Sequence, residues 1–81
     1  MTRQEIFNKV QIVVSEELAN EQQKITPEAN LTLDLGADYL DLIAVFQALE
    51  DAFNTRIPAQ EAKQLLTVQQ VVNYIGQKVI F

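Results

Sequence analysis

Residues 35–50 read LGADYLDLIAVFQALE, and this stretch contains the clearest helix start in the chain. Asp38 follows a glycine and an alanine, and as an N-cap it can accept hydrogen bonds from the free amides of a helix. Asp41 then falls at the third helical position, where the positive end of the helix dipole stabilises a carboxylate. Tyr39 takes the first helical position. We therefore expect a helix that runs from here to about Phe53.

The apolar residues of this helix share one face on a helical wheel, and a second set of residues falls on the opposite face. We expect the first set to belong to the hydrophobic core and the second set to point outward. The core set is Leu42, Val45, Phe46, Leu49 and Phe53, and the outward set is Leu40, Ala44, Gln47 and Asp51.

Capping boxes predict two other long helices, because an N-cap hydroxyl and a Glu or Gln at the third helical position can exchange hydrogen bonds. Thr2 with Glu5 opens a helix over about 3–19, and Thr67 with Gln70 opens the last helix. Both helices carry an apolar stripe at helical spacing. The stripe residues are Ile6, Val10, Val13, Val14 and Leu18 in the first helix, and Val68, Val71, Val72 and Ile75 in the last.

The segments between these helices are predicted to be irregular or short. Residues 20–37 show no sustained period and contain Pro27 and Gly36, so we expect a long loop that folds back onto the core. Residues 59–66, AQEAKQLL, have room for only a short helix. Gly76 is expected to loosen the end of the last helix. The apolar loop residues that need cover are Ile25, Leu31, Leu33 and Leu35.

Together these predictions describe an all-α four-helix bundle with three longer helices, one short third helix, and a long loop between the first and second helices. The chain has 81 residues, of which 48% are hydrophobic, so we expect a single domain over residues 1–81 with one core. A strand over Val79–Phe81 would have no partner strand. No apolar stretch approaches the ~18 residues that a membrane span needs, and we expect a soluble, cytoplasmic monomer.

The composition argues against catalysis. Cysteine and histidine are absent, which removes the most nucleophilic side chain and the commonest general base. We therefore expect no enzyme and no metal site. Asp34 and Asp38 resemble the start of a calcium-binding loop, but its glycine comes early and Val45 stands where the bidentate Glu should be. The six basic residues form no stripe that would suit nucleic acid.

The negative charge is concentrated in one part of the chain. Residues 25–55 contain six acids and no Lys or Arg, a net charge of −6, while the rest contains five acids and six bases, a net charge of +1. A negative surface of this kind attracts basic partners and repels nucleic acid and anionic membranes.

Over almost its whole length the sequence resembles the acyl carrier proteins and related carrier domains of fatty acid and polyketide synthesis. That family is marked by a leucine, a glycine, a small residue and Asp-Ser-Leu, then an apolar helix with Leu-Glu and Phe, and then Ile-Pro. The late stretch LLTVQQVVNYI resembles the family's last helix. The residues that match in order are Leu35, Gly36, Ala37, Asp38, Leu40, Leu49, Glu50, Phe53, Ile57 and Pro58.

The resemblance implies a 4′-phosphopantetheine arm, which this family attaches to the serine of Asp-Ser-Leu through a phosphodiester. Tyr39 takes that position here, between Asp38 and Leu40, so we expect the arm to be absent. A phenol oxygen lies further from the backbone than a serine hydroxyl, and its phosphate ester is more labile. As an ordinary structural residue, Tyr39 would lay its ring over the apolar entrance between helices. Ser15, the only serine, falls in the middle of the first helix.

The resemblance also implies docking through the second helix onto basic surfaces of acyl-transfer, ketosynthase or phosphopantetheinyl transferase enzymes. Two of the corresponding residues here, Ala44 and Gln47, leave the middle of that face uncharged. The full docking set is Asp38, Leu40, Asp41, Ala44, Gln47 and Asp51.

Three functions remain open. The first is a carrier in acyl synthesis, either with unusual loading at Tyr39 or with an original serine replaced by it. The second is a module without an arm that docks to carrier-dependent enzymes as a regulator, spacer or decoy. The third is a structural bundle within a larger assembly.

Overall fold

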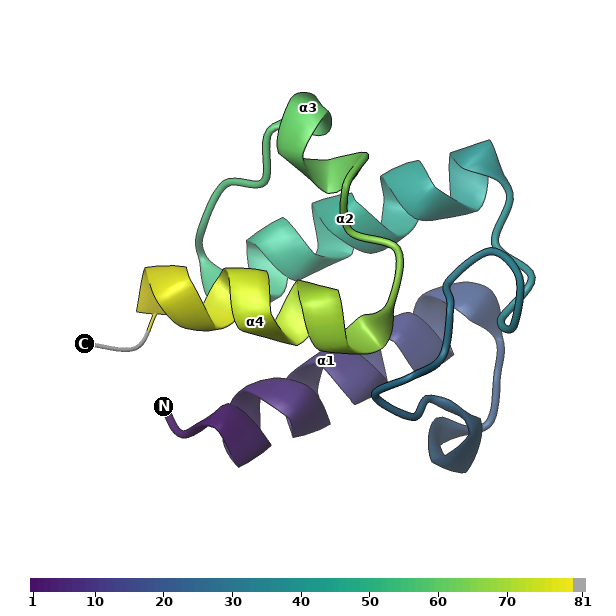
Figure 1. The fold of residues 1–81 in the computed structure, drawn as a ribbon, viewed down its shortest axis with the longest axis horizontal. Helices are drawn as coiled ribbons and strands as arrows, with labels where there is room; N and C mark the ends of the chain where they lie inside the picture. Colours follow the sequence, from purple (N-terminus) through teal and green to yellow (C-terminus); the bar gives the residue numbers. More distant parts are fainter. Residues whose placement is uncertain (80–81) are drawn as a thin grey trace.

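The computed structural model describes residues 1–79, which form four α-helices and one short 3₁₀ helix (Figure 1). The predicted all-α fold, with a short third helix and a long loop after the first, is confirmed. In the part of the chain that is described, the only strand-like pairing is a single bridge between Asn30 and Thr67. The helices are α1 (Arg3–Leu18), η1 (Gln22–Lys24), α2 (Tyr39–Phe53), α3 (Ala59–Ala62) and α4 (Val68–Val79).

Each long helix begins with a reciprocal pair of hydrogen bonds between side chains and backbone. At α1, the Thr2 hydroxyl accepts from the Glu5 amide at 3.1 Å and the Glu5 carboxylate accepts from the Thr2 amide at 2.7 Å. These bonds to the Thr2 backbone and side chain lower the pKa of Glu5. At α4, the same exchange joins Thr67 and Gln70 at 3.1 and 3.2 Å. Both predicted capping boxes are confirmed.

The helix ends differ slightly from the sequence predictions. α1 ends at Leu18, because Ala19 takes a left-handed conformation with φ 53° and ψ 41°. α4 continues through a buried Gly76 to Val79, so the glycine does not end the helix. Val79, the first residue of the possible strand, is therefore helical, and residues 80 and 81 lie outside the described part.

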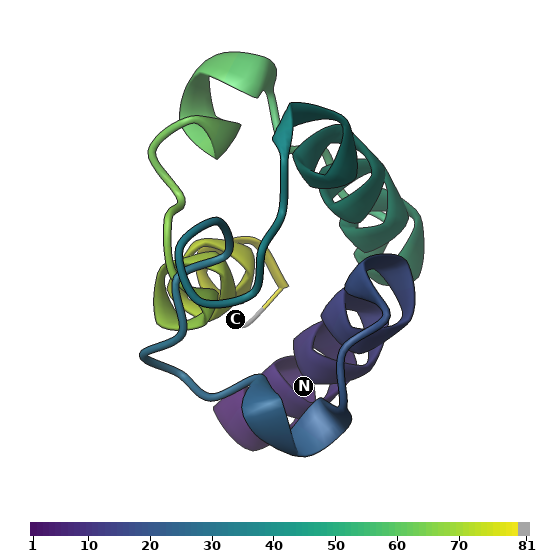
Figure 2. The same ribbon diagram turned by 90° about the vertical axis from the view of Figure 1, so that its right-hand side faces the viewer.

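The core lies between three helices and the long loop. α1 packs against both α2 and α4, and the loop between α1 and α2 runs across one end of the bundle (Figure 2). All buried side chains in residues 1–79 are apolar, so the core contains no polar group that needs a partner. The buried core cluster is Ile6, Val10, Val14, Ile25, Ala29, Leu31, Leu35, Val45, Leu49, Phe53, Ile57, Val68, Val71, Val72 and Ile75.

Leu33 corrects one prediction, because its side chain is 83% exposed rather than covered. The segment around it is a helical turn: the Asp34 amide donates to the Asn30 carbonyl, and the Gly36 amide donates to the Thr32 carbonyl. In such a turn, residues four apart share a side. Leu31 and Leu35 therefore point to the core together, while Leu33 points to solvent.

The predicted core face of α2 is also only partly right. Val45, Leu49 and Phe53 are buried, but Leu42 and Phe46 are half-buried and only pack against the cluster. The element that faces Leu42 and Phe46 across a groove is α3, which has only four residues. It is too short to cover the whole apolar face of a helix of 15 residues.

α3 has no buried residue, and side chains of α4 bond to α3 and to the segment that precedes it. The Tyr74 hydroxyl on α4 donates a hydrogen bond to the Glu61 carboxylate on α3. Lys78 places its Nζ 4.8 Å from the centre of the Tyr74 ring and donates to the Arg56 carbonyl at 2.7 Å. Desolvation, and then the bond to Glu61, raises the pKa of Tyr74 above its ordinary value of 10.0.

The substitution Ala19→Gly should raise the free energy of unfolding by about 1 kcal/mol, because only glycine adopts the left-handed region without a Cβ penalty. Asn54 at the end of α2 has φ 50° and is the matched control. Asparagine tolerates this region better than alanine, so Asn54→Gly should gain less. Urea denaturation of both variants measures the difference, and an equal or larger gain at Asn54 would contradict the explanation.

The Tyr74–Glu61 bond should make stability depend on alkaline pH. Tyr74→Phe keeps the ring under Lys78 but loses the donor, and should cost about 1 kcal/mol or less at neutral pH. Because folding raises the pKa of Tyr74, its contribution is fully present below the ordinary value of 10.0 and is lost as pH rises through the folded value. Urea denaturation of both chains across this range should therefore show a shrinking difference in stability. A constant difference would exclude this role.

Candidate functional site

The residues that the sequence singles out meet at a loop-to-helix corner, residues 36–39. Gly36 has φ 77°, a conformation that strains any residue with a Cβ, and it turns the chain toward α2. Asp38 is the N-cap: its Oδ1 accepts from the Asp41 amide at 2.8 Å, while Asp41 Oδ2 accepts from the Asp38 amide at 3.1 Å. This capping box fixes the backbone on both sides of Tyr39 and confirms the predicted helix start.

The side chains of Tyr39 and Leu40 are exposed although the backbone around them is fixed. Tyr39 is 74% exposed and Leu40 is 72% exposed. A side chain at position 39 is therefore presented to solvent on an ordered first helical turn. Ser15 does not offer such a site, because it lies within α1 and its hydroxyl donates to the Ile12 carbonyl at 2.8 Å.

The loop that leads to the corner is held by backbone and side-chain hydrogen bonds. Asn30 Oδ1 accepts from the amides of Thr32 and Leu33 at 2.9 and 2.8 Å, and Asp34 Oδ2 accepts from the Asn30 amide at 2.7 Å. The Leu31 amide donates to the Leu66 carbonyl at 2.9 Å, which joins the loop to the segment before α4. The approach to the corner is thus an ordered part of the fold.

An apolar groove lies beside the corner, between α2 and α3, with a volume of about 380 Å³. Ligand pockets commonly have volumes of about 300–1,000 Å³, so the groove is large enough for part of an apolar chain. Tyr39 lies at one end of it, as expected for a ring over an apolar entrance. The other lining residues are Leu42, Ile43, Phe46, Gln47, Glu50, Ile57, Ala59, Ala62 and Lys63.

Sequence reasoning predicted an apolar entrance between helices near Tyr39 but not the residues that line this groove. Its α3 wall comes from Ala59, Ala62 and Lys63, which carry no motif. One signal was present in the sequence: Ile43 is apolar but lies outside the predicted core face of α2. Such a residue indicates a second apolar contact of the helix, here the groove, where it remains 39% exposed.

The predicted docking residues do not all lie in the same environment. Leu40, Gln47 and Asp51 are exposed, while Ala44 is half-buried. Asp38 and Asp41 use their carboxylates in the capping box. Nearby, the Glu50 carboxylate accepts from the Ile57 amide at 2.7 Å and holds the chain that leaves α2.

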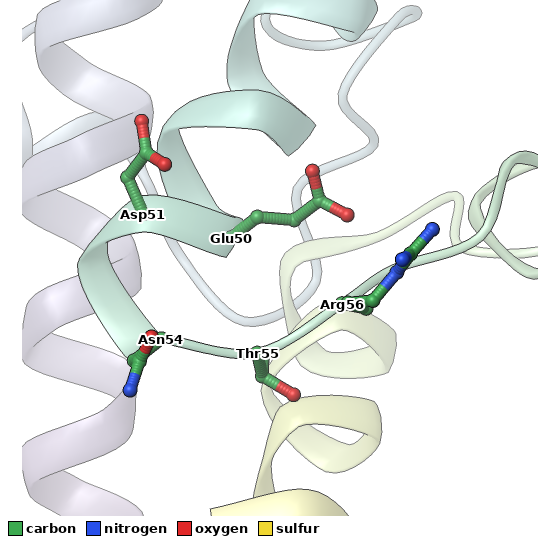
Figure 3. A pocket seen from close by; sticks show the side chains of 5 residues that line it. All are labelled: Glu50, Asp51, Asn54, Thr55 and Arg56. Carbon is green, nitrogen blue, oxygen red and sulfur yellow. The ribbon is translucent and has the colours of Figure 1, made fainter.

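A second, polar hollow lies at the carboxyl end of α2, lined by Glu50, Asp51, Asn54, Thr55 and Arg56 (Figure 3). The figure shows these side chains pointing in different directions rather than toward one point. In residues 1–79, no group of three or more Asp or Glu side chains could hold a metal ion. No helix in the same residues is long and apolar enough to cross a membrane.

Comparison with known proteins agrees with this geometry. Residues 8–75 match the family model described as "Phosphopantetheine attachment site". The acyl carrier protein of Guillardia theta is 47% identical over 79 residues, which cover 98% of each chain. The acyl carrier protein of Cyanidioschyzon merolae is 48% identical over 77 residues, 95% of this chain and 85% of that protein. The acyl carrier protein of Thermosynechococcus vestitus is 42% identical over 79 residues, 98% of each chain.

These matches cover nearly the whole chain, and the all-α fold is the one that the resemblance implied. Proteins of this family carry acyl groups for other enzymes and are not enzymes themselves, which agrees with a chain that lacks cysteine and histidine. The chain belongs to the acyl carrier protein family.

Proposed function

We propose that this chain is an acyl carrier domain for fatty acid or polyketide-type synthesis with a variant attachment site at Tyr39. One observation carries the proposal: position 39 is the first residue of α2, and its side chain is 74% exposed beside an intact capping box. The match to the phosphopantetheine attachment model supports 4′-phosphopantetheine as the group that relatives hold at such a position.

The hydroxyl of Tyr39 does not suit the phosphodiester by which the family attaches its 4′-phosphopantetheine arm. The family esterifies a primary alcohol close to the backbone, whereas Tyr39 offers a phenol at the far end of a rigid ring. A phenolate is also a better leaving group than an alkoxide, so a phosphodiester formed there hydrolyses more readily. We therefore propose that the chain with Tyr39 remains without the arm.

A second candidate function follows from the same exposure. Leu40, Gln47 and Asp51 remain exposed on α2, so the face expected to dock is present even without an arm. A chain of this kind would bind the basic surfaces of acyl-transfer, ketosynthase or phosphopantetheinyl transferase enzymes as a regulator, spacer or decoy. The two candidates share one scaffold. The first acts as a carrier only when position 39 is loaded, as it would be with a serine there, and the second needs no arm.

The substitution Tyr39→Ser should restore attachment, because it supplies the missing alcohol and leaves the capping box unchanged. With coenzyme A and a broad-specificity phosphopantetheinyl transferase, the Tyr39→Ser chain should gain the mass of one phosphopantetheine. The tyrosine chain should keep its original mass. Intact-mass spectrometry reads both results, and Tyr39→Ala is the control that has neither hydroxyl.

Other outcomes of the same measurement separate the candidates. Loading of the tyrosine chain at a rate comparable to the serine chain would overturn the arm-free proposal and make the protein an ordinary carrier with an unusual linkage. A serine chain that stays unloaded, with unchanged helical circular dichroism, would show that transferase recognition is also lost. The carrier function would then survive only as ancestry.

Docking should depend on charge. Asp51→Lys should weaken binding to a phosphopantetheinyl transferase with a basic surface by roughly fivefold, about 1 kcal/mol, and the affinity of the original chain should fall as salt rises. Asp51 is chosen because Asp38 and Asp41 also cap α2. Glu17→Lys is the control. It makes the same charge change at an exposed residue of α1, outside residues 25–55. Equal effects at both positions, measured by titration calorimetry, would argue against docking through α2.

A further inference from the structure

Asn20 joins two parts of the chain that are far apart in sequence. It follows the left-handed Ala19, and its backbone amide donates to the Ser15 carbonyl at 3.1 Å, so its backbone belongs to the end of α1. Its side-chain Nδ2 donates to the Leu35 carbonyl at 3.1 Å in a partly buried contact. The end of α1 is thereby bonded directly to the last residue before the corner.

The Leu35 carbonyl that Asn20 bonds belongs to the peptide that leads into Gly36, a residue with no side chain to pack. The Leu35 carbonyl and the Gly36 amide share one peptide plane. Gly36 has φ 77° and no side chain, and no atom lies within 4 Å of where a Cβ would be, so no side-chain packing at Gly36 helps to fix this peptide. Besides the burial of the Leu35 side chain, hydrogen bonds therefore define the orientation of this plane.

Two hydrogen bonds hold the plane, one at each side. The Gly36 amide donates to the Thr32 carbonyl at 3.1 Å, which is a bond within the loop. The bond from Asn20 to the Leu35 carbonyl comes from the start of the long loop, where the chain leaves α1. Without it, the only hydrogen bond on this peptide is the one from the Gly36 amide to the Thr32 carbonyl, and we expect that bond to open more often.

We propose that Asn20 is a positioning residue for position 39: it orients the Leu35–Gly36 peptide and thereby sets how the first turn of α2 is presented to a modifying enzyme. The proposal rests on the proposed function, because it takes residue 39 as the position that is modified. Asn20 itself touches neither the modified atom nor the outward face of α2. Its effect is expected on turnover rather than on docking.

The first test measures the corner directly in the chain as it stands. Asn20→Asp keeps the size of the side chain but replaces the donor with a carboxylate that faces a carbonyl. The amides of Gly36 and Ala37 should then exchange with solvent about fivefold faster or more, as expected for the loss of one hydrogen bond. The amides of Val14 in α1 and Val72 in α4 should keep their exchange rates.

Asn8→Asp is the matched control, because it makes the same charge change on an exposed part of α1. Asn20→Ala removes the donor without adding charge and should give the same local pattern. Gly36 and Ala37 amides that exchange at the original rate in both Asn20 variants would overturn the proposal. Acceleration spread equally over α1 and α4 would also overturn it, because it would indicate general destabilisation.

The second test measures presentation of residue 39 in the Tyr39→Ser chain. Steady-state loading from coenzyme A by a phosphopantetheinyl transferase should show kcat lowered about fivefold by Asn20→Ala, with KM for the carrier unchanged. An unchanged kcat, or a change confined to KM, would refute a positioning role. If Tyr39→Ser is not loaded even with Asn20 intact, the proposed function fails instead, while the exchange test still decides whether Asn20 orders the corner.

Discussion

The segment between α1 and α2 must bury apolar side chains while satisfying its backbone almost without regular secondary structure. Ile25, Leu31 and Leu35 lie in the core cluster, so their segment cannot leave its amides and carbonyls without partners. Two side chains supply part of what is missing. Gln11 on α1 donates to the carbonyls of Gln22 and Ile25 at 2.9 and 3.1 Å, and Asn20, just after α1, donates to the Leu35 carbonyl at 3.1 Å. The position of α2, and with it the candidate site, depends on this arrangement.

Backbone and side chain have separate roles at the corner. The capping box between Asp38 and Asp41 orders the backbone of Tyr39, while the tyrosine ring projects into solvent beside the groove. A substitution at this position therefore alters the available chemistry without removing a buried contact. This explains how a chain that is 47% identical to a curated acyl carrier protein can keep the family's fold with a tyrosine at position 39.

The features that could be predicted from the sequence are those fixed by neighbouring residues. The capping residues Thr2 and Asp38 and the apolar stripes of α1 and α4 act within one helix, so their patterns are visible in the sequence. Leu33 was expected to be covered because it is apolar, but a sequence without a sustained period did not reveal the helical turn that points it to solvent. Phe46 and the groove required knowledge of where a four-residue α3 lies, and the bond from Asn20 to Leu35 joins residues with no common pattern. Contacts of this kind are set by tertiary structure alone.

The exposure of Tyr39 has a consequence for the fate of the protein in a cell. Chaperones and proteases act on the fraction of a protein that is unfolded, and a solvent-facing side chain at the start of a helix changes that fraction little. A chain that cannot accept a prosthetic group would therefore fold, persist and accumulate as well as one that can. Abundance and folding of this protein carry no information about its chemical competence, which is decided by the atoms of a single exposed side chain.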